Sequence, residues 1–255
     1  MRRRTSWLLV CLLVAGCATA PVPRDLRVLV YNIHAGKDAS GTVNLQRVAD
    51  VIASTNADIV LLQEVDRMTT RSGGVDHLAE LERLTKMHSV FGKAIDFQGG
   101  QYGIAILSRW PITTSETISL RGSPIEARVA LAAQTNGLRV INTHFDASNV
   151  ETYRLEEVDH LIEEVRRFGK PVLVGGDFNT EPSSHVYARL RESGLRDAFA
   201  DCGGKTGFTY PADTPVKRID YLFIKGSFRC VSANVPGSQA SDHRPLLVEI
   251  AKSGS

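Results

Sequence analysis

The order of strand and helix patterns constrains the fold of this chain more than any other feature of its sequence. Apolar, β-branched runs predict strands, at 26–31, 58–63, 89–97, 102–107, 127–134, 138–143, 172–174, 219–224, 229–235 and 245–251. Apolar residues at helical spacing predict helices, at 45–52, 75–86, 149–169 and 183–192. Strands and helices alternate at the start, whereas the middle of the chain is a series of strands that includes the hairpin turn pair Asn136-Gly137.

This order predicts an α+β fold in which two mixed β-sheets pack face to face with helices outside. The chain has 255 residues, which is enough for one large core or two small ones. No internal repeat and no break in composition divides it. We therefore predict a single domain over residues 26–252, preceded by a segment of a different kind.

The first residues have the pattern of a targeting signal. Three arginines at 2–4 precede Trp7 to Gly16, an apolar run of ten residues that is too short to span a bilayer. The run ends in Leu13-Val14-Ala15-Gly16-Cys17, which resembles a bacterial lipobox. We predict a lipoprotein signal peptide at 1–16, lipidation of Cys17 and a short, proline-containing tether at 17–25. An ordinary secretory signal cut near Ala20 is the alternative.

This signal places the protein in the cell envelope of a bacterium, anchored by lipid and facing the periplasm or the cell exterior. Without the arginines at 2–4 the chain has 27 basic and 28 acidic side chains, a net charge of −1. The mature protein therefore has no overall basic character for binding nucleic acid. In an exporting cell Cys202 and Cys230 can pair, although two buried free thiols are an open alternative.

Polar residues follow the predicted strands at the points where several of them end: Asn32, Glu64, His144, and Asp177 with Asn179. Such strand ends meet at one edge of a sheet, so these side chains are expected to gather there. Asp220 lies within an apolar strand and needs a partner, which His243 or Arg218 could supply. An oxygen-rich cluster of this kind suits Mg²⁺ or Mn²⁺ and does not suit zinc.

Each of these features also has a plain structural interpretation. Gly175-Gly176-Asp177-Phe178-Asn179 alone could be a turn, because glycine, aspartate and asparagine are turn formers. Four histidines are interpreted as bystanders, namely His77, His88, His160 and His185. Three arginines could bind phosphate oxygens, namely Arg71, Arg109 and Arg128. For Arg71, a solvated loop charge is the alternative.

Seven motifs occur in order along the chain: Tyr31-Asn32-Ile33, Leu62-Gln63-Glu64-Val65-Asp66, Tyr102-Gly103-Ile104-Ala105-Ile106-Leu107-Ser108-Arg109, Asn142-Thr143-His144, Gly175-Gly176-Asp177-Phe178-Asn179, Arg218-Ile219-Asp220-Tyr221 and Ser241-Asp242-His243-Arg244-Pro245. Together they resemble the endonuclease/exonuclease/phosphatase superfamily. The resemblance covers nearly the whole mature chain. It implies a four-layer sandwich of two mixed sheets between helices and Mg²⁺-dependent hydrolysis of a phosphate ester.

The resemblance also implies a role for each matching residue. Glu64 is similar to the principal metal ligand, with Asn32 and Asp242 beside the metal. Asp177 and Asn179 are similar to the pair that orients the attacking water and the phosphoryl oxygens. His243 with Asp220 resembles the family's His-Asp dyad, and His144 would donate to a phosphate oxygen.

Two departures from the family pattern concern the substrate. His34 stands where the exonuclease III-like abasic-site endonucleases usually have Asp, and His144 stands where they have Tyr. The chain is more similar in this respect to the sphingomyelinase, deoxyribonuclease I and phosphatase branches. No Trp-Cys-Asp-Arg type motif of the inositol polyphosphate 5-phosphatases is present. His34 and Arg71 are the candidates for binding substrate.

The sequence therefore predicts a monomeric, lipid-anchored, Mg²⁺- or Mn²⁺-dependent phosphoric ester hydrolase outside the cytoplasm. Its substrate is expected to be a phosphodiester of membrane or small-molecule origin. A surface nuclease that uses DNA or RNA as substrate is one alternative. A noncatalytic binding protein on the same fold is the other, although a binding module needs no complete His-Asp dyad.

Overall fold

The computed structural model describes residues 25–38, 40–204 and 206–253. The predicted signal peptide at 1–16, Cys17 and all of the tether except its last residue lie outside these ranges. Within the described ranges, no helix combines the length and apolar character needed to cross a membrane.

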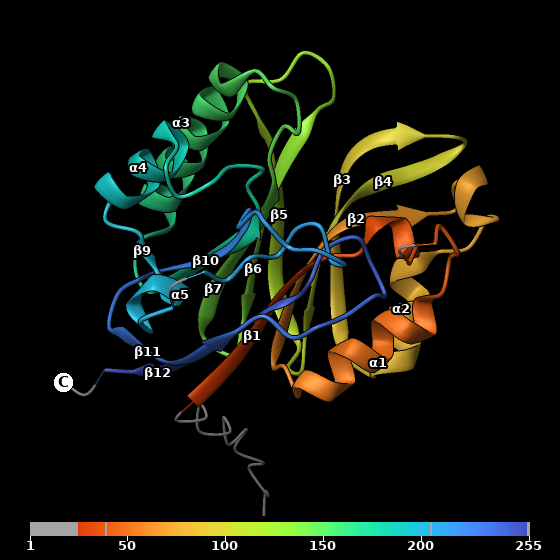
Figure 1. Ribbon diagram of the computed structural model, residues 1–255, viewed down its shortest axis with the longest axis horizontal. Helices are drawn as coiled ribbons and strands as arrows, with labels where there is room; N and C mark the ends of the chain where they lie inside the picture. The colour runs from red at the N-terminus through yellow and green to blue at the C-terminus, as the bar shows by residue number, and fades with distance from the viewer. Residues whose placement is uncertain (1–24, 39, 205, 254–255) are drawn as a thin grey trace, which may run out of the picture.

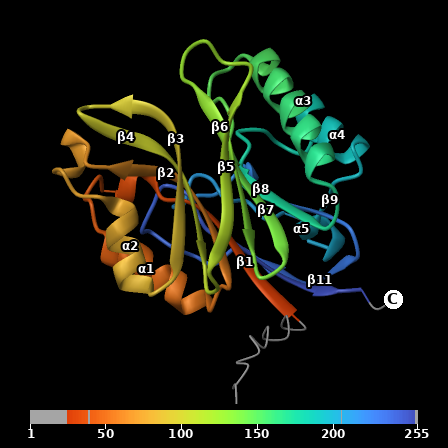
Figure 2. The same ribbon diagram turned by 180° about the vertical axis from the view of Figure 1, so that it is seen from behind.

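Two six-stranded sheets form the centre of the molecule (Figures 1 and 2). The first has the order β11 (Phe228–Asn234), β12 (Leu246–Lys252), β1 (Asp25–Asn32), β2 (Ile59–Arg67), β4 (Gly100–Ser108), β3 (His88–Phe97). The second has the order β5 (Ile112–Leu120), β6 (Arg128–Thr135), β7 (Leu138–His144), β8 (Val172–Asp177), β10 (Asp220–Lys225), β9 (Arg196–Asp197). Both sheets are mixed, because β1 with β2 and β7 with β8 are parallel and the other pairs are antiparallel.

The four longer helices lie on the outer faces of the two sheets, whereas the shortest helix packs its buried residues into the core between the sheets (Figure 1). The helices are α1 (Leu45–Thr55), α2 (His77–Thr85), α3 (Glu151–Phe168), α4 (His185–Glu192) and the short α5 (Ala198–Asp201), with single 3-10 turns at His34–Gly36 and Thr70–Ser72. The first sheet carries α1 and α2, and the second carries α3 and α4. This is the predicted four-layer α+β sandwich, so the predicted fold class is confirmed.

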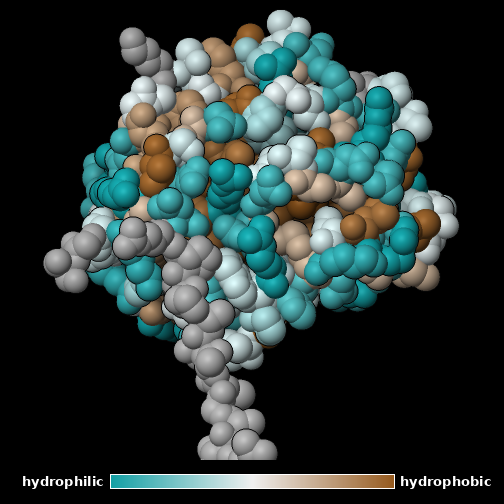
Figure 3. Space-filling view, turned by 90° about the horizontal axis from the view of Figure 1, so that it is seen from below, coloured by the Kyte–Doolittle hydropathy of each residue, from teal (hydrophilic) through white to brown (hydrophobic). Residues whose placement is uncertain are grey.

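Three apolar clusters hold the four layers together. Side chains such as Val30, Leu61 and Leu131 fill the space between the two sheets, and the other two clusters lie between each sheet and its helices. On the outer surface seen from below, polar residues predominate and apolar ones form small groups between them (Figure 3). Because burial of apolar area drives folding, the packed sheets provide a rigid base for the loops above them.

Helix starts differ slightly from the sequence expectations, and the capping residues explain why. The helix predicted from Val75 begins at His77, because the Asp76 carboxylate accepts hydrogen bonds from the backbone N–H groups of residues 78 and 79. The helix predicted from Ser183 begins at His185, because the Ser184 hydroxyl accepts from the Tyr187 N–H.

One long strand has no counterpart among the sequence predictions. β5 is an edge strand whose middle residues are Thr, Thr, Ser, Glu and Thr, most of them exposed. It therefore lacks the apolar alternation that predicts a half-buried strand. β9 and α5 were also missed, because elements of two and four residues are too short to carry a periodic pattern.

The two remaining cysteines form a disulfide in the structure. Cys202, which follows α5, is bonded to Cys230 on β11, with the Cα atoms 5.4 Å apart. The bridge closes a loop of roughly 29 residues, which corresponds to about 3–4 kcal/mol in the chain-entropy model. It therefore joins the second sheet's α5 to the first sheet and restrains the segment that leads to β10.

Candidate active site

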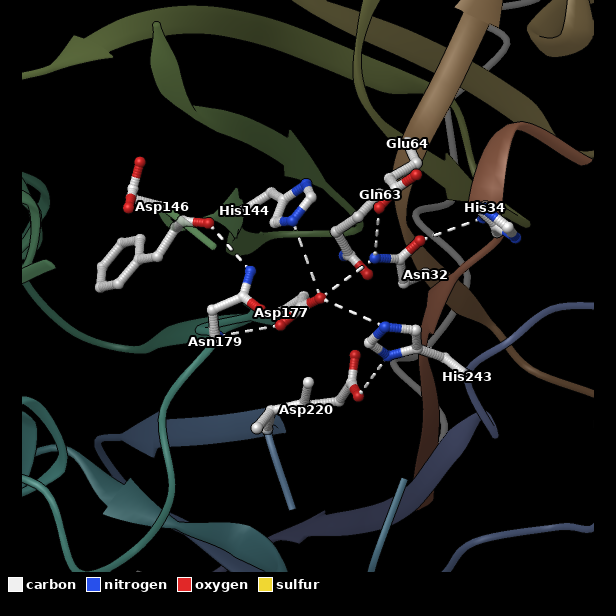
Figure 4. Close-up of polar contacts among 12 residues, drawn as sticks. Asn32, His34, Gln63, Glu64, His144, Asp146, Asp177, Asn179, Asp220 and His243 are labelled. Atoms are coloured by element: carbon white, nitrogen blue, oxygen red, sulfur yellow. Dashed lines mark hydrogen bonds and ion pairs between the residues drawn. The ribbon is translucent and has the colours of Figure 1, made fainter. Parts of the chain in front are cut away.

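A cavity of about 670 Å³ opens where the predicted polar residues gather. Six of the predicted site residues line it, namely Glu64, His144, Asp177, Asn179, Asp242 and His243. Asn32 and Asp220 lie just beneath, each about 1% exposed. Figure 4 shows that Asn32, His144, Asp177 and Asp220, at the ends of strands from both sheets, and His243, in the loop before β12, point toward one another, whereas Asp146 points away.

Sheet register brings three of these residues side by side. Asp177 at the end of β8 is paired with His144 on β7 and with Asp220 on β10. Directly paired residues project to the same face of a sheet. Three chemistry-bearing side chains are therefore neighbours although their positions in the sequence are 33 and 43 residues apart.

Asp177 is the centre of the arrangement (Figure 4). Its Oδ2 accepts a hydrogen bond from Asn32 Nδ2 at 3.0 Å and lies 3.7 Å from His144 Nε2 and 3.6 Å from His243 Nε2. Its Oδ1 accepts from the backbone N–H of Asn179 at 2.9 Å. Burial, and then the neighbouring Asp220 carboxylate, raise the pKa of Asp177.

The predicted dyad is present. His243 Nδ1 and Asp220 Oδ2 are 2.9 Å apart and both side chains are buried. Burial alone would lower the pKa of His243, but the carboxylates of Asp220 and Asp177 raise it by more. The sequence left open whether Asp220 pairs with His243 or Arg218, and the structure shows His243, because Arg218 donates to Asp197 instead at 2.7 Å.

His144 has the opposite electrostatic environment. Burial, with smaller contributions from Arg128 and His243, lowers its pKa well below the ordinary value of histidine. The imidazole is therefore neutral at physiological pH. It faces Asp177 with its Nε2, whereas no carboxylate among the described residues lies within hydrogen-bond distance of its ring.

The carboxylates of Glu64 and Asp242 and the amide of Asn32 form the side of the cavity where a cation would be held, called the cation wall below. The backbone of Glu64 has φ of 57° at a bulge in β2, where the register with β4 shifts. A bulge re-aims the side chain of its residue, and the Glu64 carboxylate lines the cavity, where its Oε1 accepts from Asn32 Nδ2 at 3.2 Å. Asp242 lines the same cavity.

This donor set fits a hard divalent cation. Carboxylate and amide oxygens are the ligands of Mg²⁺ and Mn²⁺, and within the described residues Glu64 Oε2 receives no hydrogen bond that would compete. Asp177, Asp220 and His243 also offer ligand atoms within 4.8 Å of one another. His243 and Asp220 are hydrogen-bonded to each other, so this second group can transfer protons as well as bind a cation.

A buried amide pair supports the site from below. Gln63 Nε2 donates to Asn142 Oδ1 at 2.7 Å, and Asn142 Nδ2 donates to the carbonyls of Leu62 and Ala105. Gln63 precedes Glu64, and Asn142 lies two residues before His144. The bonds therefore join the two sheets directly beneath the cavity and fix the distance between the cation wall and the histidines.

The three candidate arginines have different surroundings. Arg71 donates to both carboxylate oxygens of Asp66, at 2.7 and 2.8 Å, and is not among the residues that line the cavity. Arg109 pairs with Asp58 at 2.9 Å. Arg128 lines the cavity while only 8% exposed, and its Nε has no hydrogen-bond acceptor among the described residues.

His34, the other substrate candidate, lies at the margin of the site. Its Nδ1 is 3.6 Å from Asp242 Oδ1, and its backbone N–H donates to Asn32 Oδ1 at 3.0 Å. It is not among the residues that line the cavity. Its observed contacts position Asn32 and Asp242.

Several lining residues were not given a role by sequence reasoning, among them Tyr102, Tyr210, Arg154 and Lys217. Tyr210 packs its ring against His243, with the ring centroids 4.8 Å apart. Tyr102 belongs to a motif that sequence analysis identified, but nothing in the motif separates a lining residue from a buried one. The others carry no sequence signal, because Tyr210 and Lys217 lie in a loop without periodicity and the apolar spacing of α3 gives no role to its polar residue Arg154.

A model of the endonuclease/exonuclease/phosphatase family matches residues 29–243. Uncharacterized protein YbhP of Escherichia coli (strain K12) is 27% identical over 245 residues, which cover 89% of this chain and 96% of that protein. A UPF0294 protein of Vibrio campbellii is 29% identical over 88% of this chain and 77% of its own.

Solved structures show the same fold. An endonuclease/exonuclease/phosphatase from Beutenbergia cavernae has a TM-score of 0.79 at 24% identity, covering 91% of this chain and 72% of that chain. The mannosyl-6-phosphatase Bt3783 of Bacteroides thetaiotaomicron has a TM-score of 0.75 at 18% identity, covering 89% and 99%. The human Nocturnin catalytic domain with bound sulfate has a TM-score of 0.70 at 21% identity, covering 90% and 94%.

Proposed function

This chain belongs to the endonuclease/exonuclease/phosphatase family, and we propose that it is a divalent-metal-dependent hydrolase of a phosphate ester. One observation carries the proposal. The His243–Asp220 dyad, Asp177 and the Glu64 carboxylate converge on one cavity from both sheets. A module that only binds a ligand has no need for an imidazole oriented by a buried carboxylate.

Glu64 and Asp242 would hold Mg²⁺ or Mn²⁺, with Asn32 beside them. A cation in this place supplies charge neutralisation for the phosphoryl oxygens. Asn32 Nδ2 contacts both Glu64 Oε1 and Asp177 Oδ2, so it holds the cation wall and the catalytic carboxylate in a fixed relation. This is the positioning on which phosphoryl transfer chiefly depends.

Asp177 and His243 would act on the attacking water. Asp220 accepts the Nδ1 proton of His243, which fixes the tautomer and leaves Nε2 facing Asp177 and the cavity. In its neutral form, which the positive charge of a cation bound nearby would favour against the two carboxylates, Nε2 accepts the proton that the water loses as its oxygen bonds to phosphorus. Asp177 and Asn179 orient the water, and their own orientation is fixed by the hydrogen bond between the Asn179 N–H and Asp177 Oδ1.

Arg128 and His144 would bind the oxygens of the phosphoryl group. The Arg128 guanidinium faces the cavity nearly buried and pairs through Nη1 with Glu126 Oε1 at 3.0 Å, while its Nε has no acceptor within the described residues, so a phosphate can complete its contacts. The neutral His144 ring can donate one hydrogen bond to the same group.

The place of action is also a proposal. The lipobox-like sequence ending at Cys17 supports a lipid-anchored protein in the bacterial cell envelope, facing the periplasm or the exterior. The Cys202–Cys230 disulfide supports an oxidising compartment. Mass spectrometry of the mature N-terminus tests the anchor, and an unacylated Cys17 would disprove it.

The catalytic proposal is tested with 4-nitrophenyl phosphate and bis(4-nitrophenyl) phosphate, each with Mg²⁺, with Mn²⁺ and after chelation. We expect metal-dependent release of nitrophenol, and a decrease of about 10³-fold in kcat/KM for His243→Ala. The exposed His88 supplies the matched control, since His88→Ala should keep full activity. Full turnover by His243→Ala, or equal turnover after chelation, would overturn the proposal.

A further inference from the structure

The cavity continues past the catalytic residues into an arm between the starts of α3 and α4. We define this polar arm by six lining residues. Ser148 and Asn149 lie between β7 and α3, Glu151 is the first residue of α3, and Glu181, Ser183 and Ser184 lie between β8 and α4. Figure 1 shows α3 and α4 together over the second sheet, with both segments at the same end of it.

The walls of the polar arm are held in place by contacts among themselves. Glu151 accepts from the His185 N–H at 3.2 Å and lies 3.2 Å from His185 Nδ1, so it links the first residues of α3 and α4. Asn179 Nδ2 donates to the carbonyl of Phe145 at 3.0 Å, which joins the same two segments closer to Asp177. The arm is therefore a preformed feature of the fold.

Three side chains of the arm remain free to bind a ligand. Asn149, Glu181 and Ser183 are exposed, and within the described ranges their side chains make no hydrogen bonds. The amide of Asn149, the carboxylate of Glu181 and the hydroxyl of Ser183 together offer both hydrogen-bond donors and acceptors. Hydroxyl groups both donate and accept, so a ligand rich in hydroxyls can satisfy all three.

The same lining disfavours the other groups that phosphate esters carry. The two segments contribute no aromatic side chain to the cavity, so a nucleobase has nothing to stack on there. The carboxylates of Glu151 and Glu181 oppose the second phosphate of a polynucleotide, and the nearby Arg154, which also lines the cavity, donates through Nη1 to the carbonyls of Asp146 and Ser148. An acyl chain would find only Ala147 as an apolar residue of these segments in the lining.

We infer that the polar arm binds the alcohol portion of the substrate and that this portion is an uncharged, hydroxyl-rich group, a sugar or a polyol. The inference rests on the proposed function. In the reaction, the oxygen of water bonds to phosphorus, the bond between phosphorus and the polyol oxygen breaks, and that oxygen leaves with a proton as the free alcohol. Asn149, Glu181 and Ser183 determine specificity and take no part in this step.

The test compares hexose 6-phosphate with butyl phosphate, each as the monoester and as the methyl diester, beside the two nitrophenyl esters and a single-stranded oligodeoxynucleotide. With Mg²⁺ or Mn²⁺ present, we expect kcat/KM for the hexose ester to exceed that of the matched butyl ester by about 10-fold or more, the equivalent of one or two hydrogen bonds. The oligodeoxynucleotide should be the poorer substrate.

Asn149→Ala should lower kcat/KM for the hexose ester by about 5–10-fold, mainly through KM, and change the nitrophenyl esters less than twofold. Asn234→Ala provides the matched control, because Asn234 is an exposed asparagine on β11 that does not line the cavity. Equal loss on nitrophenyl and hexose esters would contradict a specificity role.

The two proposals fail in distinguishable ways. If no nitrophenyl ester is hydrolysed, the proposed function is wrong and the inference falls with it. If the nitrophenyl esters are hydrolysed but the butyl esters match the hexose esters, or the oligodeoxynucleotide is the best substrate, only the polyol inference is overturned.

Discussion

Two clusters of buried charge lie close together in this molecule, and they differ in how completely their hydrogen bonds are satisfied. In the closed cluster, the fully buried Asp66 accepts from Arg71 Nε at 2.7 Å, from Arg71 Nη2 at 2.8 Å and from Thr69 Oγ1 at 2.8 Å. The Arg71 guanidinium also packs over the rings of Phe97 and Tyr102. The charges of Asp66 and Arg71 thus compensate each other within the protein.

In the open cluster around Asp177, by contrast, the hydrogen-bonding groups are only partly satisfied. His144 and His243 approach Asp177 only to 3.7 and 3.6 Å, and the nearly buried Arg128 has an Nε without an acceptor in the described part of the chain. All of these groups face the cavity. Buried polar groups normally find partners, so an incomplete set beside a cavity marks the place where a ligand completes it.

The largest effect is expected from breaking the closed cluster. Arg71→Met leaves the Asp66 carboxylate buried without its partner and should lower the free energy of unfolding by about 3–5 kcal/mol. Denaturant titration measures the loss, and Arg83→Met, which removes an exposed ion pair with Glu80 on α2, should leave the free energy of unfolding nearly unchanged. A stable Arg71→Met protein without activity would instead make Arg71 a substrate-binding residue.

Arg128→Met tests the open cluster in the opposite way. Removing a phosphate-binding guanidinium should lower kcat/KM by about 100-fold, whereas the free energy of unfolding should fall by only about 1 kcal/mol, because the ion pair of Arg128 Nη1 with Glu126 Oε1 is partly exposed and Arg128 Nε lacks an acceptor. Steady-state kinetics on bis(4-nitrophenyl) phosphate and denaturant titration provide the two readouts. Unchanged kcat/KM would show that the exposed side of the cavity, not Arg128, holds the phosphoryl group.

A buried carboxylate behind the open cluster makes stability depend on pH. Glu157 on α3 is fully buried, and burial raises its pKa to about 7, against an opposing hydrogen bond from the Asp146 N–H and the nearby Arg128. The folded state thus binds this proton more tightly than the unfolded state. Its stabilising contribution is complete below the unfolded pKa of 4.5 and is lost as pH rises to about 7.

Glu157→Gln should remove this dependence. The amide oxygen can still accept from the Asp146 N–H, so the variant should match the wild type at pH 4 and be more stable by about 3 kcal/mol at pH 8. Denaturant titration at both pH values measures the difference, with the exposed Glu156→Gln as control. Equal pH dependence in wild type and Glu157→Gln would contradict the assignment.

The smallest effect is expected at His77, a residue near the closed cluster whose ring nitrogens lack hydrogen-bond partners within the described residues. Its side chain is fully buried and neither ring nitrogen has a partner within the described residues, while burial lowers its pKa. His77 is not among the residues that line the catalytic cavity. His77→Phe should therefore raise the free energy of unfolding by about 1 kcal/mol and leave kcat/KM unchanged. Destabilisation would indicate an internal water bound to the ring.

Much of the fold could be predicted because it follows from local periodicity. The buried strands and the amphipathic helices carry apolar patterns and were placed correctly, although β2 and β8 extend three to four residues beyond the predicted ends, where polar residues and glycines replace the apolar ones. β5 could not be found, since the side chains of an edge strand are solvated and polar. The start of α2 depended on the Asp76 cap, which a periodic pattern does not reveal.

The candidate site was predictable in part for a different reason. Asn32, His144 and Asp177 stand at strand ends, and the geometry of parallel strands brings such ends together. Glu64 was found as well, although it lies inside β2 at a bulge. The choice among Arg71, Arg109 and Arg128 could not be made, because three similar guanidinium groups differ only in the carboxylates that fold up beside them.

The sequence by itself determined which residues are apolar and at what spacing, and so it determined the two sheets, their helices and the set of polar side chains at the strand ends. The tertiary structure decided which of those polar groups are satisfied and which are not. Asp66 and Asp177 are both buried carboxylates, but one meets a guanidinium and the other meets a cavity. That difference depends on contacts between residues far apart in the chain, which periodicity along the chain cannot encode.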